Sequence, residues 1–386
     1  MERETALARV ASERAARRAR LPAVIARPQV IVAAAVVVGM LARFAAAASW
    51  DNDNWDQRSY EIVVDIMRRG GNVYLDTQRY NYSPLWSFVL LGLDAVARSL
   101  HVSLHFAIGA FLSLIDLANA VLIARIASRE GSPAHIAFAA MVLNPVAVLI
   151  SAYQGQFETL AALPILATLA FAPRFAFVWL LGTASIVVKH LLTFSVWALY
   201  VSVFGTRRAI AASVASGLVF AALFVPYALG GAIVPILGNV FLYNGLCCFY
   251  GFASIVPDRL ALGLFAAVMS VLPFIGIERL SLGRPALLRL AAISLVAFIP
   301  GFGQQYFMLP VLFAAYAPSR WYVLFTLVAS VWLVSTPDNV GLVTPPFDRH
   351  VLVTIAWLVA LLWMADIVRK AARLDPRALL ARDRAR

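Results

Sequence analysis

Charged residues are scarce in this sequence. Of its 386 residues, 13% are charged and 62% are hydrophobic, whereas a soluble domain carries about a quarter charged residues. The mean hydropathy is +0.82, so polar side chains are too few to cover the apolar surface of such a chain. The composition therefore excludes an ordinary soluble domain and indicates a membrane protein.

A disulfide framework and a concentrated basic patch are also missing. The only cysteines, Cys247 and Cys248, are neighbours in the chain, and a disulfide between adjacent residues is sterically poor, so we assign them no redox role. The net charge is +12, but the arginines stand mostly at the ends of apolar segments and in the two tails. That distribution indicates membrane topology rather than binding to nucleic acid.

Long apolar runs recur across residues 30–368, separated by short polar or Pro/Gly breaks. Many are long enough to cross a hydrocarbon core of about 30 Å. Open sheets leave backbone groups unsatisfied in lipid, so the predicted fold class is all-α, a polytopic membrane helical bundle. The first run, 30–48, follows a long Arg-rich segment and exceeds a normal signal-peptide core, so we interpret it as a retained anchor.

The arginines predict the orientation of the helices. The first run is preceded by basic residues that include Arg17, Arg18, Arg20 and Arg27, which places the N-terminus in the cytoplasm by the positive-inside rule. Further basic breaks, each expected in the cytoplasm, lie at 125–129, 174, 207–208, 279–289, 320 and from 369 onward. Polar turns between them, expected outside, lie at 153–158, 189–190, 231–256, 303–306 and 336–350. The result is about 12 crossings with both termini inside.

The chain then divides into a basic N-terminal segment (1–29), a transmembrane domain (30–368) and a basic tail (369–386). Residues 49–103 are expected to form a structured first external loop. Within it, Tyr60, Val63, Val64 and Met67 recur at helical spacing among charged residues, which predicts an amphipathic interfacial helix. Gly70-Gly71 ends this helix. A second helix begins at Pro84 and lies along the outer interface, because counting 84–97 as a crossing would invert the topology downstream.

Three carboxylates, Asp51, Asp53 and Asp56, follow the first apolar run. They suit N-caps and partners of a helix dipole. Carboxylates at the boundary of water and lipid also suit a general base, since partial desolvation raises their pKa, and paired acids invite a divalent cation. Residue types leave these interpretations open.

Further polar residues stand at the turns expected outside. Lys189 and His190 separate two apolar runs, and a lysine at the membrane is costly. Its amine either meets an anionic phosphate or snorkels to the interface. Other polar turns contain Gln154, Gln156, Glu158, Gln305 and Tyr306. For these, a binding role and a turn-only role stay open.

Two polar pairs stand at helical spacing. His101 and His105 are four residues apart and would ligate a metal together if both were helical, although no acidic or cysteine partner is near in sequence. Asp116 and Asn119 are three apart within an apolar run, so they face one side of a helix, toward the bundle interior. For this second pair we expect a packing role.

The first external loop resembles that of the C-type (GT-C superfamily) membrane glycosyltransferases, and most closely the polyprenyl-phosphate-mannose-dependent enzymes of glycosyltransferase family 87. The likeness rests on an acidic residue before Ser59-Tyr60, on Gly70-Gly71-Asn72-Val73-Tyr74, and on Arg79-Tyr80-Asn81-Tyr82-Ser83-Pro84-Leu85-Trp86. Asn144-Pro145 with Gly155-Gln156-Phe157-Glu158 is similar to the helix-end motif of the family, where Asp commonly stands in place of Glu158. Lys189-His190 and Gln305-Tyr306 also have counterparts there.

The resemblance implies an inverting transfer of a sugar from a polyprenyl-phosphate donor to a lipid or glycan acceptor, outside the cytoplasm at the cell membrane. Mannose is favoured as the sugar. A loop aspartate would be the general base: Asp56 by its spacing to Tyr60, or Asp53 or Asp51 by closeness to the membrane. Substrate-binding residues would be Arg79, Tyr80, Tyr82, Gln154, Gln156, Glu158, Lys189, His190, Gln305 and Tyr306. A divalent cation stays open, since metal dependence varies among C-type enzymes.

A transporter or lipid flippase is the competing hypothesis. It would also be a polytopic bundle, with Asp116 and Lys189 inside the membrane. Such folds show inverted repeats and interrupted helices near mid-membrane. We find no convincing repeat, and most polar candidates are expected at one face of the bilayer, which favours the glycosyltransferase.

Overall fold

The structure is a computed structural model that describes residues 27–49, 55–172, 174–242, 250–335 and 349–373. Within these ranges the regular structure is helical and contains no strand, which confirms the predicted all-α class. Six helical segments there are long and apolar enough to cross a membrane, namely Pro28–Ala48, Leu104–Arg129, Ala134–Tyr153, Thr206–Phe241, Asp258–Arg279 and His350–Arg373. The predictions for Asp51, Asp53, Cys247 and Cys248 fall outside the described residues.

The N-terminal part of the bundle is built on α2 (Pro28–Ala48) and α5 (Leu104–Arg129), followed by α6 (Ala134–Val142), α7 (Pro145–Ala147), the π-helix η1 (Val148–Tyr153) and α8 (Glu158–Phe171). Helix α2 packs on α5, α6 and η1. Two glycines allow these backbones to approach closely. A Cβ atom at Gly39 would lie 2.5 Å from Val142 Cγ1, and one at Gly109 would lie 2.5 Å from the Ala152 carbonyl oxygen.

The C-terminal part contains α9 (Phe175–Val188), η2 (His190–Leu192), α10 (Thr193–Phe204), α11 (Thr206–Ala222), α14 (Asp258–Phe274), η6 (Ile275–Arg279), α15 (Arg284–Phe298), η7 (Gln304–Phe307), α16 (Met308–Ala314), α17 (Arg320–Ser335) and α18 (Arg349–Arg373). All seven residues of α16 are buried, as expected of a helix at the centre of a bundle. The outer helices α2 and α11 instead expose apolar side chains such as Leu41 and Leu218.

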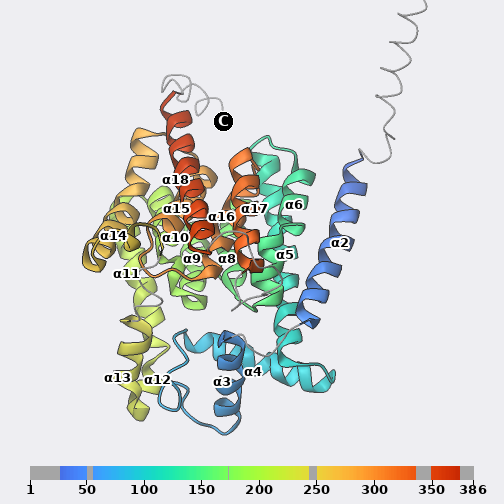
Figure 1. Cartoon of the computed structure of the whole chain (residues 1–386). Helices are drawn as coiled ribbons and strands as arrows, with labels where there is room; N and C mark the ends of the chain where they lie inside the picture. Colours follow the sequence, from blue (N-terminus) through green and yellow to red (C-terminus); the bar gives the residue numbers. More distant parts are fainter. Residues whose placement is uncertain (1–26, 50–54, 173, 243–249, 336–348, 374–386) are drawn as a thin grey trace, which may run out of the picture.

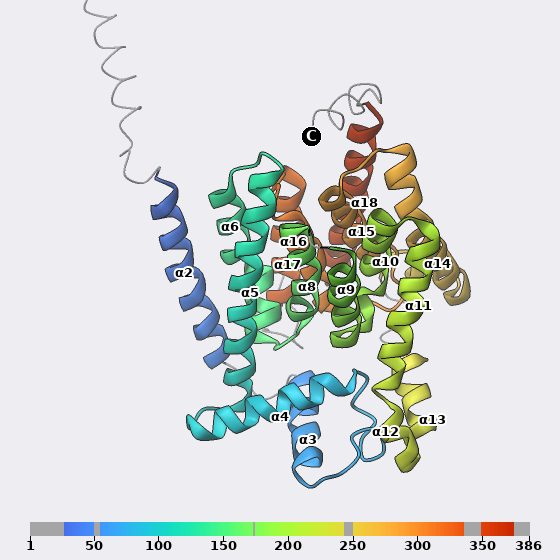
Figure 2. The same cartoon turned by 180° about the vertical axis from the view of Figure 1, so that it is seen from behind.

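The segment predicted to be the first external loop forms a layer of its own at one end of the bundle. It contains α3 (Trp55–Arg68) and α4 (Pro84–Ser99), and α4 lies across the lower end of α5 (Figure 2). Helix α3 ends before Gly70, whose φ is +69°, so both predicted helices and their Gly and Pro boundaries are confirmed. The start of α2 and the end of α18 both lie at the opposite end of the bundle (Figure 1).

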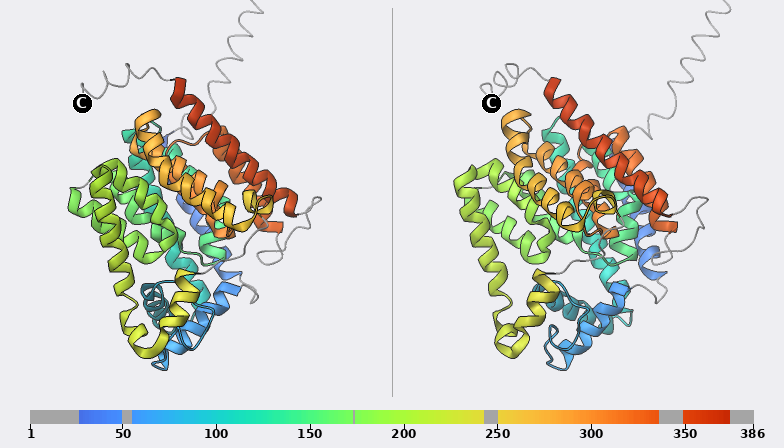
Figure 3. Two further views of the ribbon diagram at one scale, coloured as in Figure 1. Left: turned by 90° about the vertical axis from the view of Figure 1, so that its left-hand side faces the viewer. Right: turned by 60° about the vertical axis from the view of Figure 1, so that its left-hand side comes forward.

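The prediction of an external loop at 231–256 is wrong for its first part. Helix α11 is continued by α12 (Val225–Tyr227), η3 (Ala228–Ala232), α13 (Ile233–Ile236) and η4 (Leu237–Phe241). Gly231 has φ +93° and ψ +1°, which are not helical values, so the chain turns at this glycine and the apolar residues after it form a second helix. Figure 3 shows the resulting helical hairpin beside α3. The short η5 (Gly251–Ser254) follows later.

His101 and His105 do not meet the condition for a shared metal site, because they do not stand on one helix. His101 has φ +56° in the turn between α4 and α5. The Ser103 hydroxyl then accepts a hydrogen bond from the Phe106 N–H and caps α5. His105 therefore stands on α5 without His101 beside it, and the spacing on which a shared metal site depended is lost.

Candidate functional site

Three segments far apart in the sequence meet at the first turn of α3. Asp56 lies in the first turn of α3 and is partly exposed. The Gln156 side-chain amide donates to Asp56 Oδ2 at 2.6 Å, and Lys189 Nζ lies 2.5 Å from Glu158 Oε1. The Lys189 and Glu158 side chains are 5% and 0% exposed. We call Asp56, Gln156, Glu158 and Lys189 the acid–lysine cluster.

A helix break supplies Gln156 and Glu158 to the cluster. Helix η1 ends at Tyr153 and α8 begins at Glu158. The positive end of the helix dipole stabilises a carboxylate at this position. Between them, Gly155 has φ +68°, and a Cβ atom there would lie 2.0 Å from Gln57 Nε2. The same Gln57 amide donates to the Gln154 carbonyl at 2.8 Å, so the break is bonded directly to α3.

A second break supplies Lys189. Helix α9 ends at Val188, Lys189 is extended with φ −150°, and the chain turns helical again as η2. The Ser83 hydroxyl, at the start of α4, donates to the Val187 carbonyl. The segment with α3 and α4 therefore holds the end of α9 as well as the turn before α8.

Aromatic rings form the wall of the cluster. The Lys189 Nζ atom lies 4.5 Å from the Phe157 ring centroid and 5.3 Å from that of Tyr82, within range of a cation–π attraction. Trp86 stacks on Phe157 with centroids 4.0 Å apart, and Tyr60 packs edge-on against Trp86 at 5.7 Å. These rings exclude water from Lys189 and strengthen its electrostatic interactions.

Burial raises the pKa of Asp56 above the ordinary aspartate value. The charge of Glu158 raises it further, whereas the charge of Lys189 and the hydrogen bond from Gln156 lower it. Burial also raises the pKa values of Tyr60 and Tyr82 well above that of a free phenol. Asp56 is thus the group of this site suited to exchange a proton, while both phenols stay neutral.

The remaining predicted residues have more varied positions. Arg79 donates to the Trp55 carbonyl at 3.1 Å and lies over the Trp55 ring, so it borders the start of α3. The Tyr80 hydroxyl donates to the Ser83 carbonyl at 2.6 Å, which is a turn contact. The His190 ring lies 5.8 Å from the Phe220 ring, toward α11.

The turn at η7 is only partly joined to the cluster. Gln305 folds back onto Gly303, where a Cβ atom would lie 2.6 Å from its amide nitrogen. Tyr306 packs edge-on against Phe302 at 6.3 Å, and it also acts on Tyr82, whose pKa it raises slightly. Of this pair, Tyr306 is therefore the residue that borders the cluster.

The expectation of a divalent cation stays a prediction. In the described part of the chain, no three His, Cys, Asp or Glu side chains form a metal-ligating group. Asp51 and Asp53 fall outside that part.

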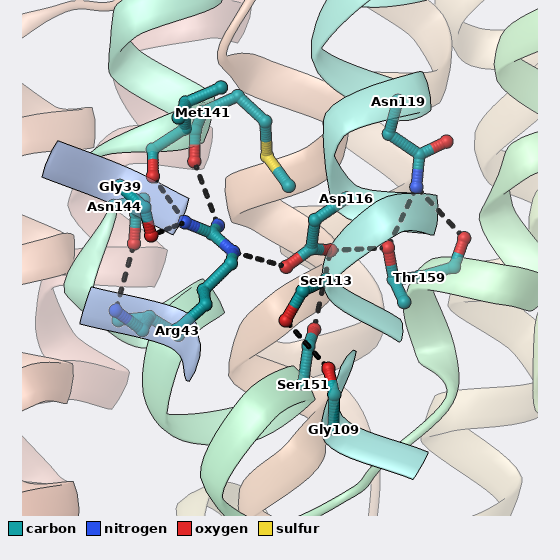
Figure 4. A network of polar contacts seen from close by, with 12 residues as sticks. Gly39, Arg43, Gly109, Ser113, Asp116, Asn119, Met141, Asn144, Ser151 and Thr159 are labelled. Carbon is teal, nitrogen blue, oxygen red and sulfur yellow. Dashed lines mark hydrogen bonds and ion pairs between the residues drawn. The ribbon is translucent and has the colours of Figure 1, made fainter. Parts of the chain in front are cut away.

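A buried ion pair stands inside the bundle, between α2 and α5 (Figure 4). Arg43 Nε lies 3.2 Å from Asp116 Oδ2, and both side chains are 1% exposed. The Thr159 hydroxyl donates to Asp116 Oδ1 at 2.5 Å, and that of Ser151 donates at 3.3 Å. Charged groups in a bundle of this kind are expensive unless they are paired and hydrogen-bonded, as these are.

The same network fixes the ends of neighbouring helices. The Arg43 guanidinium also donates to the carbonyls of Met141 and Val142, at the end of α6. Asn119 donates to both the carbonyl and the hydroxyl of Thr159, at 2.9 and 2.7 Å. Asp116 and Asn119 are buried on one face of α5 as expected, and the network holds η1 and α8 on either side of the break that supplies Gln156.

Two residues of this region were not predicted from the sequence. Arg43 interrupts the first apolar run, and a lone arginine in one apolar run with a lone aspartate in another is a recognisable signal for a pair. Gln57 had no comparable signal, because its partner is a backbone carbonyl 97 residues away.

Comparison of the chain with protein-family models, with curated proteins and with solved structures finds no match.

Proposed function

We propose that this chain is an inverting glycosyltransferase of the C type, which transfers a sugar, with mannose favoured, from a polyprenyl-phosphate donor to a lipid or glycan acceptor. The observation that carries the proposal is the bonding of Asp56 to the turn before α8, next to the Lys189–Glu158 pair. The resemblance implied that these segments act together, and they meet although about 100 residues separate them.

In the proposed reaction, Asp56 is the general base. Its carboxylate takes the proton of the acceptor hydroxyl while the acceptor oxygen attacks the anomeric carbon of the sugar. The bond from that carbon to the phosphate oxygen breaks, and the polyprenyl phosphate leaves with the bonding electron pair. Lys189, with Arg79 at the edge of the site, would face the charge on the departing phosphate.

The ion pair of Lys189 with Glu158 adds a constraint to this mechanism. The positive charge of Lys189 is already balanced, and Glu158 Oε2 has no hydrogen-bond partner among the described residues. A donor phosphate would therefore compete with Glu158 for the ammonium group. Glu158 thereby pairs with the buried ammonium group until the donor arrives.

The arrangement of helices supports the topology proposed with this function. Besides the six long segments, the described residues contain four shorter apolar helices, α8, α9, α10 and α17, and the largely buried helices α15 and α16. Together they would make 12 crossings, which would bring the start of α2 and the end of α18 to one side, in agreement with Figure 1. The proposed enzyme lies in the cell membrane with both termini in the cytoplasm and the acid–lysine cluster outside.

A transporter or flippase has one observation in its favour, the buried Arg43–Asp116 pair, since such pairs also mark ion pathways. Both charges are fully engaged: Asp116 holds three donors, and the Arg43 guanidinium contacts Asp116 and helix-end carbonyls. A group that must bind and release an ion needs a free or exchangeable partner. The pair therefore suits a fixed support better than a transport site.

The substitution Asp56→Asn tests the function. Asn keeps the shape and can still bond Gln156, but it cannot take the acceptor proton, so turnover should fall by on the order of a hundredfold or more. The assay measures transfer of labelled mannose from synthetic polyprenyl-phosphate mannose to a lipid extract of the source membrane. The control is Asp65→Asn on the exposed face of the same helix, which should transfer at the parental rate.

Donor binding is measured on the same samples, and Asp56→Asn should retain it. Transfer at the parental rate by Asp56→Asn would refute Asp56 as the base. Movement of a substrate across vesicles by the parental protein, without any glycosidic bond formed, would refute the enzyme altogether.

The role of Lys189 needs a paired experiment, because Lys189→Met leaves Glu158 buried without its cation. That single change should destabilise the protein by about 3–5 kcal/mol. Adding Glu158→Leu removes the stranded charge and should restore much of the stability, but not the affinity for polyprenyl-phosphate mannose. If the double variant binds the donor as tightly as the parental protein, Lys189 has only a structural role.

A further inference from the structure

A cavity with a partly polar lining lies at the end of the bundle opposite the acid–lysine cluster. Its volume is about 600 Å³, and it is enclosed by the end of α5, the ends of α8 and α10, and the starts of α9 and α15. The lining residues are Arg129, Glu130, Thr168, Leu169, Ala172, Val178, Val203, Gly283, Arg284 and Pro285. Nothing in the proposed reaction uses this cavity.

Two arginines give the cavity its chemistry. In the described part of the chain, neither Arg129 nor Arg284 forms an ion pair with a carboxylate. Glu130 is the one carboxylate among the lining residues, so the lining carries a net positive charge. The Thr168 hydroxyl is engaged with the Pro164 carbonyl at 3.0 Å. Arg129 Nη1 donates to the Leu169 carbonyl at 3.5 Å, so the remaining N–H groups of Arg129 and those of Arg284 are the available donors. Planar guanidinium N–H pairs match the oxygens of a phosphate.

The walls of the cavity are apolar, whereas its mouth carries charged residues. Leu169, Val178 and Val203 line the interior side, and Val178 is only 2% exposed. Arg129 and Arg284 are exposed at the mouth. A ligand that places an anionic group at the mouth and a hydrocarbon segment against the wall would satisfy both parts.

We propose that this cavity binds the phosphate of an anionic membrane lipid, with the first part of an acyl chain against its apolar wall. Basic pockets between membrane helices on the cytoplasmic side suit lipid headgroups of this class. The location agrees with that side, since the arginine-rich breaks of the sequence gather at this end. A soluble phosphate would use the same arginines but would gain nothing from the apolar wall.

The test measures lipid binding to the full chain, purified in detergent, by native mass spectrometry. The probes are phosphatidylglycerol, phosphatidylcholine and inorganic phosphate. The charge variant is Arg129→Gln/Arg284→Gln. The matched control is Arg207→Gln/Arg208→Gln, which removes the same charge from exposed arginines that do not line the cavity.

A third variant keeps the charge and blocks the space. A Cβ atom at Gly283 meets nothing within 4 Å, so Gly283→Leu should fold normally and fill the mouth of the cavity with its side chain. This variant tests the cavity even if the charge variant does not fold.

The parental protein should bind phosphatidylglycerol more tightly than phosphatidylcholine. The charge variant and Gly283→Leu should each weaken phosphatidylglycerol binding by roughly tenfold or more, and the control by less than about twofold. Equal binding of the two lipids by the parental protein, or equal weakening in the charge variant and its control, would overturn the proposal. If millimolar inorganic phosphate displaces the lipid, the ligand of the cavity is a soluble anion and the lipid proposal is wrong.

Discussion

Removing one member of the Arg43–Asp116 pair should destabilise the protein far more than removing both. Arg43→Met keeps much of the side-chain length but deletes the cation, so Asp116 keeps only its two hydroxyl donors. At 3.2 Å the attraction between the charges is about 5 kcal/mol for an effective dielectric constant of about 20. Both side chains are 1% exposed, so solvent does not screen this attraction.

We therefore expect Arg43→Met to lower the free energy of unfolding by about 3–5 kcal/mol, the usual cost of stranding one buried charge. Asp116→Asn should have a similar effect, since its amide can still accept from Thr159 but no longer balances the guanidinium. The double variant contains neither charge. Its loss should be smaller than the sum of the single losses by about 1–3 kcal/mol, which is the coupling between two residues in contact.

The measurement is unfolding by denaturing detergent in mixed micelles, followed by far-UV circular dichroism, for the parental protein, both single variants and the double variant. Arg58→Met is the control, because Arg58 is exposed on α3 and should change stability by less than about 0.5 kcal/mol. Additive losses in the double variant would refute the ion pair as the source of the stability. Losses below about 1 kcal/mol in both single variants would do so as well.

Three further predictions concern the site, the packing and the topology. Gln156→Leu removes a hydrogen bond that lowers the pKa of Asp56, so the acidic limb of the transfer rate, measured against pH, should move to higher pH. An unchanged acidic limb would mean that Gln156 does not influence the base. Gly39→Ala places a methyl group 2.5 Å from Val142 Cγ1 and should cost about 1–3 kcal/mol of unfolding free energy in the same detergent titration; a neutral result would mean that α2 and α6 can separate freely. A cysteine at position 77 should react with an impermeant reagent added outside intact cells, and one at position 281 should not; labelling at 281 would contradict the proposed topology.

The sequence determined those features that depend on neighbouring residues. The scarcity of charge and the long apolar runs predicted an all-α membrane bundle, because only helices and closed barrels satisfy the backbone in lipid. Helical spacing around Tyr60, together with Gly70 and Pro84, predicted α3 and the start of α4. The same local logic failed at Gly231, since a glycine with positive φ can join two helices directly as well as begin a long loop.

The tertiary structure decided which of these residues act together. Lys189 was expected to meet a phosphate or the interface, but its partner is Glu158, 31 residues earlier in the chain. The contact of Asp56 with Gln156 spans 100 residues, and that of Arg43 with Asp116 spans 73. Such contacts depend on how helices pack side by side, and a pattern with a period of a few residues carries no information about that packing. Composition and periodicity therefore sufficed to predict the bundle, whereas the partners of its buried charges were set only when its helices were assembled.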